Sequence, residues 1–117
     1  MKIELTVAYV GFGGNIGDGE YFYSFRPDVI LVTEVNTPLD FVFHSATTKD
    51  FSMLEMVSTD TSKQMGKATK AADGRSLIVN DANSLTQLTQ LAIIVKDNSR
   101  GKIISCDPQV LNIPDIS

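Results

Sequence analysis

The stretch from residue 25 to residue 44 constrains the fold of this chain more than any other part of the sequence. It begins with an apolar run at residues 29–32, and later Leu39, Phe41 and Phe43 alternate with other residues. Alternation with a period of two is typical of a half-buried strand, and a charged turn bracketed by prolines separates the two segments. The stretch therefore predicts two strands joined by a turn, with the other strands packed against this pair.

The remaining apolar segments are also short. Glycine-rich residues 11–19 predict a turn, residues 98–101 predict a hairpin connection, and residues 58–73 predict a loop. The spacing of Leu85, Leu88 and Leu91 predicts a helical turn capped by Asn83 or Ser84. A further six segments are predicted as strands, although Met and Leu in the third of them suit a helix equally well: residues 2–10, 21–25, 51–57, 75–80, 93–97 and 102–106.

Seven or eight short strands at roughly ten-residue spacing are typical of an all-β protein. We therefore expect residues 1–117 to form a single Greek-key β-sandwich, either cupredoxin-like or immunoglobulin-like. The tail, residues 107–117, contains two prolines and is expected to lie extended over a sheet edge.

Composition narrows the classes of function. Fourteen acidic and ten basic residues give a net charge of −4, which argues against a nucleic-acid-binding protein. The sequence contains no apolar run of membrane-spanning length, and polar residues interrupt its first apolar segment, so neither a membrane anchor nor a signal peptide is expected. The single cysteine, Cys106, forms no internal disulfide, and the simplest setting is the cytoplasm.

Few residues suit catalysis. His44 is the only histidine, and neither a nucleophile elbow nor a metal-ligand cluster accompanies it, so we expect a non-enzymatic protein without cofactor or metal. The glycine-rich stretch follows a strand, as a dinucleotide-binding loop does, but Ile16 replaces the third glycine. An alternative is a small-ligand-binding protein or enzyme that uses Gly13, Gly14 and Asn15 together with His44.

The segments FRPDVILV and NTPLDFVF resemble the front half of a cupredoxin-type sandwich. That resemblance implies a copper site made of a histidine, a later cysteine, a second histidine and usually a methionine. His44 and Cys106 occupy two such places, but no histidine or methionine follows the cysteine, so we do not expect copper.

The segment CDPQVLNIP resembles the carboxyl end of a small bacterial family of uncharacterised β-sandwich proteins, the DP-EP family. The resemblance covers Asp107, Pro108, Asn112 and Pro114, and implies a fold but no activity. Gln109 and Val110 stand where the second half of the family motif would place an acidic residue and a proline. Asp-Pro and Asn favour turns, so a structural terminus is the expected role.

These observations favour a binding or self-assembly module. Tyr21, Tyr23 and Phe25 alternate along one predicted strand, and at an open sheet edge they would form an interface. We therefore expect a homo-oligomer, and a dimer formed by sheet pairing as the first candidate. A structural component of a phage or secretion assembly is a further alternative.

Overall fold

The computed structural model describes residues 1–60 and 62–114, which form ten strands and no helix. No helix of membrane-spanning length and hydrophobicity therefore occurs in this part of the chain. The strands are β1 (Lys2–Tyr9), β2 (Tyr21–Arg26), β3 (Val29–Val32), β4 (Thr37–Phe43), β5 (Phe51–Ser58), β6 (Thr69–Lys70), β7 (Ser76–Asp81), β8 (Gln87–Asp97), β9 (Lys102–Cys106) and β10 (Gln109–Asn112).

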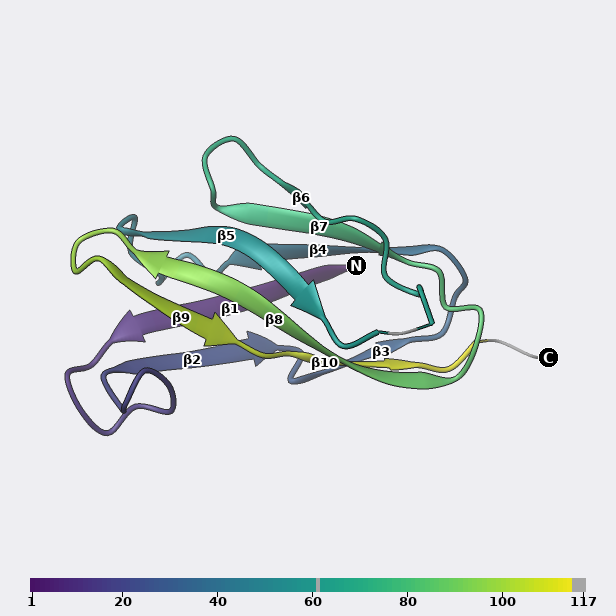
Figure 1. Cartoon of the computed structure of the whole chain (residues 1–117), viewed down its shortest axis with the longest axis horizontal. Coiled ribbons are helices and arrows are strands. Elements are labelled where there is room, and N and C mark those ends of the chain that lie inside the picture. The colour runs from purple at the N-terminus through teal and green to yellow at the C-terminus, as the bar shows by residue number, and fades with distance from the viewer. Residues whose placement is uncertain (61, 115–117) are drawn as a thin grey trace.

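The strands form two mixed sheets packed face to face, so the predicted β-sandwich is confirmed (Figure 1). The first sheet has the order β2-β1-β4-β7-β6, and the second has the order β3-β10-β8-β5, with β9 also paired to β8. β1 pairs parallel with β4, and β3 pairs parallel with β10. Parallel neighbours require connections that cross between the sheets, as in Greek-key sandwiches.

The core lies between the two sheets because every second side chain of the long strands points inward. Along β1, Ile3, Leu5 and Val7 are buried, and along β8 the burial alternates over most of its eleven residues. Burying one large apolar side chain stabilises the fold by about 1.5–3 kcal/mol. The largest fully buried side chains are Tyr21, Phe41, Ile3, Leu5, Ile30, Leu39, Met53, Leu77, Leu91 and Ile93.

Both strands predicted between residues 25 and 44 are present, but they lie in different sheets. β3 joins β10 in the second sheet, whereas β4 lies between β1 and β7 in the first. The connecting segment includes Asn36, whose φ of 52° allows a sharp change of direction, and it carries the chain from one sheet to the other. The pair therefore spans the two layers of the sandwich instead of forming a hairpin.

Three local predictions are corrected. Residues 85–91 form no helical turn, because β8 begins at Gln87 and pairs with β10 there; Asn83 has a φ of 47°, not a helix-capping conformation. The loop at residues 58–73 contains the two-residue β6. The tail contributes β10 between β8 and β3, inside the second sheet and not over its edge, while its residues 115–117 lie outside the described residues.

Candidate functional site

The glycine-rich loop, residues 11–19, folds back onto the outer edge of β2. The side-chain amide of Asn15 pairs with the backbone of Tyr23: Nδ2 donates to the carbonyl and Oδ1 accepts from the N–H, both at 2.9 Å. The backbones of Ile16 and Tyr21 exchange a second pair of hydrogen bonds, at 3.2 and 3.1 Å. The loop therefore occupies the groups through which β2 would add another strand.

Two glycines allow this loop to lie so close to the strand. A Cβ atom at Gly14 would lie 2.0 Å from the carbonyl oxygen of Tyr21, which only glycine avoids. Gly13 has open space around it but a φ of 79°, so glycine is favoured there by the backbone conformation and not by a close contact. The predicted ligand residues Gly13, Gly14 and Asn15 thus build a cover for the strand edge.

His44 lies on the outer face of the first sheet, away from that loop. It borders a polar hollow of about 390 Å³ whose lining includes Glu4, Arg26 and Asp28 but no glycine-loop residue. The His44 Nδ1 atom accepts a hydrogen bond from the N–H of Ala46 at 2.9 Å, so the neutral ring carries its proton on Nε2. The structure does not bring His44 together with the residues of the predicted ligand loop.

The predicted interface residues on β2 are mostly core residues. β2 is an edge strand, as that interface requires, but Tyr21 and Phe25 are buried and Tyr23 is half-buried. The side chain of Phe22 alternates with them and faces outward, 42% exposed. Tyr21 and Phe25 therefore offer no accessible side-chain surface.

The hydroxyl of Tyr21 instead reaches a buried carboxylate at the end of β8. It donates to Asp97 Oδ2 at 2.6 Å, and Arg100 Nη1 donates to the same oxygen at 3.1 Å. Burial alone would raise the pKa of Asp97, but the hydrogen bonds from Tyr21 and Arg100 outweigh it and hold the pKa below its ordinary value of 3.8. Burial and the Asp97 carboxylate raise the pKa of Tyr21. Neither group changes protonation near neutral pH, which fits a structural role.

An apolar row crosses the outer face of the second sheet. Leu31 of β3, Leu111 of β10 and Leu88 of β8 lie side by side in register. Leu31 is 48% exposed and Leu88 is 57% exposed, with Leu111 half-buried between them. We call these three residues the leucine row; Val29 and Ile113, both exposed, extend it at either side. The corresponding face of the first sheet mixes polar side chains with the exposed Phe22 and Ile78; the polar ones include Glu4, Thr6, Ser24, Arg26 and Asp40.

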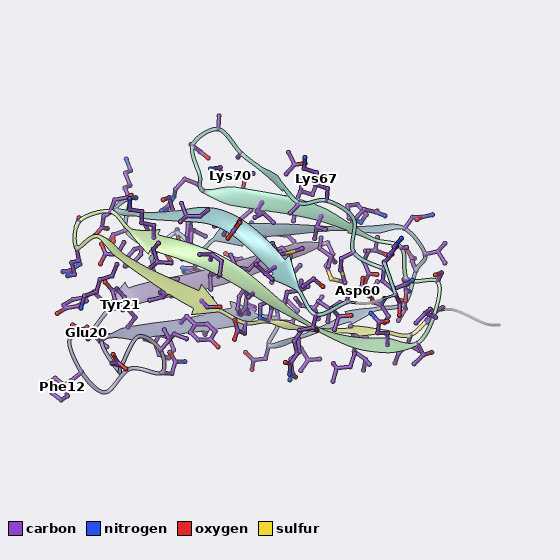
Figure 2. All side chains as sticks on the ribbon, viewed as in Figure 1. Phe12, Glu20, Tyr21, Asp60, Lys67 and Lys70 are labelled. Atoms are coloured by element: carbon purple, nitrogen blue, oxygen red, sulfur yellow. The ribbon has the colours of Figure 1, made fainter. Side chains whose placement is uncertain are left out.

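The leucine row ends at β3, an edge strand whose outer backbone groups are not covered by any described residue. The Val32 carbonyl accepts from the N–H of Ile113, directly after β10, so the backbone groups of Val32 face β10 and those of Leu31 face away from it. The edges of β5 and β6 are less open than that of β3. On β5, the Phe51 carbonyl accepts from Arg75 and the Met53 N–H donates to the Gly74 carbonyl. β6 is only two residues long; it contains Lys70, and Lys67 lies just before it (Figure 2).

The carboxyl-terminal motif continues the chain from β9 into β10 along β8. Ser105 donates to the Asp107 carboxylate at 2.7 Å, and the Pro108 carbonyl accepts from the N–H of Leu91 at 3.1 Å. Asn112 is buried at the end of β10, followed by the half-buried Pro114. The motif therefore makes these hydrogen bonds within its own chain, as expected of a structural terminus.

Comparison of the chain with protein-family models and with curated proteins finds no match. Any assignment of function therefore depends on the geometry described above.

Sequence reasoning missed the features that stand out in the structure. The leucine row could not be predicted, because its members are far apart in the chain and the spacing of the leucines around Leu88 predicts a helical turn. Asp97 was not singled out, since nothing local links it to Tyr21, which lies 76 positions away. Phe12, 87% exposed and projecting from the tip of the glycine-rich loop, had no signal beyond its apolar character (Figure 2).

Proposed function

We propose that this domain is a non-enzymatic self-assembly module that forms a two-fold dimer by pairing β3 with β3 of a second copy. The observation that carries the proposal is the leucine row, which runs up to a strand edge that no described residue covers. An exposed apolar row beside unpaired backbone groups is the surface that sheet extension uses.

The pairing has a natural register. With the two-fold axis at Leu31, the outward backbone groups of Leu31 hydrogen-bond to their own copies, and Val29 lies opposite Thr33. Residues directly opposite each other point to the same face of the sheet, so the two leucine rows meet. The dimer would then carry one continuous row of six leucines across six strands, β8, β10 and β3 of each copy.

The expected affinity is modest. Each leucine that becomes buried contributes up to about 1.5–3 kcal/mol, but Leu31 and Leu88 are already half-covered in the single chain. Association also costs about 4–15 kcal/mol of translational, rotational and side-chain freedom. The gain therefore exceeds the cost only narrowly, and the dimer should depend on concentration.

A two-fold interface uses the same patch on both chains and closes at the dimer. A component of a larger phage or secretion assembly would need a second, different contact, which Phe12 at the loop tip is exposed enough to make. A cytoplasmic setting and the DP-EP resemblance are compatible with the module and stay predictions.

Cross-linking tests the register. Leu31→Cys should form a covalent dimer with a short bismaleimide, because the axis places the two thiols next to each other. Ile103→Cys is the matched control, since Ile103 is exposed on β9 of the same sheet but away from β3. Cys106 is buried, and burial raises the pKa of its thiol to about 12, so it stays unreactive. Equal cross-linking of both variants would contradict the proposed pairing.

A further inference from the structure

Three buried oxygen atoms at one end of the sandwich have no hydrogen-bond partner. They are Asp81 Oδ2, Asn83 Oδ1 and Asn112 Oδ1, and all three side chains are fully buried. A buried polar atom without a partner costs about 1–3 kcal/mol, and more when it carries charge. Three of them in one place call for a ligand that the protein atoms do not supply.

The Asp81 carboxylate links the three residues, through the side chain of Asn112 and the backbone of Asn83. Asp81 Oδ1 accepts a hydrogen bond from the backbone N–H of Asn83 at 3.0 Å and another from Asn112 Nδ2 at 2.8 Å. Asp81 ends β7 of the first sheet, whereas Asn112 ends β10 of the second. The cluster therefore joins the two layers, although its members are separated by up to 31 positions in the chain.

Hydrogen bonds from Nδ2 fix the orientation of the side-chain amides of Asn83 and Asn112, so the Oδ1 atom of each can only be an acceptor. Asn83 Nδ2 donates to the carbonyls of Val32 and Glu34, at 3.2 and 3.0 Å. Rotating either amide by half a turn would place oxygen against oxygen. All three unpartnered atoms are thus acceptors, and one water molecule donates only two hydrogen bonds.

The local charge is also negative. No described lysine or arginine forms an ion pair with Asp81, and Asp60 on the neighbouring loop adds a second carboxylate at the same end of the molecule (Figure 2). Burial raises the pKa of Asp81, because it outweighs the hydrogen bonds from Asn112 and Asn83 that favour the ionised carboxylate. A positive ligand would satisfy both the charge and the acceptors.

We propose that Asp81, Asn83 and Asn112 bind a hard cation of the Ca²⁺ type between the two sheets. The described residues contain no group of three or more His, Cys, Asp or Glu side chains placed to hold a metal, so a transition-metal site is not expected here. Carboxylate and amide oxygens are the ligands that calcium takes from proteins, and backbone carbonyls or water complete its shell. This inference is independent of the proposed dimer.

Thermal unfolding of the full chain tests the site with Ca²⁺ as the probe. In 10 mM CaCl2 the Tm should rise by roughly 5 °C or more relative to EDTA, as expected for saturation of a sub-millimolar site. Asp81→Asn should abolish the calcium-dependent shift. Asp40→Asn removes the same charge from the outer face of β4 and should keep it.

A gain-of-function variant covers the case in which Asp81→Asn fails to fold. Asn112→Asp adds a second carboxylate to the cluster, so its calcium-dependent rise in Tm should exceed that of the parent chain. Equal Tm values for the parent chain in calcium, magnesium, sodium and EDTA would overturn the proposal. A calcium shift that survives in Asp81→Asn would also overturn it, because the ion would then bind elsewhere.

Discussion

Replacing Tyr21 with phenylalanine removes one oxygen atom and isolates the buried contact with Asp97. The ring of Tyr21 packs edge-to-face against Tyr9 and Phe51, with centroids 5.4 and 6.1 Å away, and phenylalanine preserves both contacts. What is lost is the 2.6 Å hydrogen bond to the Asp97 carboxylate. The substitution therefore measures a hydrogen bond to a buried charge with little change in packing.

The expected loss is about 2 kcal/mol in the free energy of unfolding. Hydrogen bonds to charged groups contribute about 1.5–3 kcal/mol. The value falls below the upper limit because Asp97 keeps hydrogen bonds from Arg100 and from the backbone N–H groups of Ser99 and Arg100. With a urea m-value of about 2 kcal/mol/M, the midpoint should fall by about 1 M.

Urea unfolding at several pH values supplies the assay. The folded-state pKa of Asp97 is below 3.8, so its stabilisation is fully present above that pH and disappears as the pH falls through the folded-state pKa. The difference between Tyr21→Phe and the parent chain should therefore be largest near neutral pH and shrink in acid.

Tyr23→Phe is the control, because the Tyr23 hydroxyl makes no hydrogen bond to any described residue. Its free energy of unfolding should change by less than about 0.5 kcal/mol. A Tyr21→Phe protein as stable as the control at neutral pH would refute the reasoning, as would a difference that does not depend on pH.

The remaining predictions concern the glycine-rich loop and the cysteine. Gly14→Ala should displace the loop from β2 and promote concentration-dependent association through that edge, seen by light scattering, because its Cβ would lie 2.0 Å from the Tyr21 carbonyl. Gly13→Ala costs only about 1 kcal/mol of conformational strain and should associate no more than the parent chain does. Cys106 should react with a thiol reagent only as fast as the protein unfolds, since it is buried; rapid labelling under native conditions would contradict its place in the core.

Much of the fold was predictable because period-two alternation depends on local sequence alone. The strands at residues 2–10, 51–57 and 102–106 were all identified, and the all-β class followed from them. Pairing was not predictable in the same way. Nothing in residues 29–32 reveals that β10, some eighty positions later, is the neighbour of β3.

The candidate sites were harder to predict for a related reason. A glycine-rich loop and a lone histidine can be recognised from the sequence alone and suggest a ligand site. In the structure, however, Gly14 and Asn15 cover the edge of β2. The leucine row and the Asp81 cluster are assembled from residues that meet only after folding. Local patterns therefore indicated where strands begin and end but not which side chains meet.

The molar mass of the unmodified chain, measured by light scattering over a hundredfold range of concentration, tests the self-assembly proposal most directly. We predict a mass that rises from that of one chain, 12.8 kDa, towards twice that value as concentration increases. Leu31→Lys, which places two like charges at the axis, should stay at the mass of one chain while remaining folded. A parent chain that is strictly monomeric at every concentration, or a Leu31→Lys variant that still dimerises, would contradict the account.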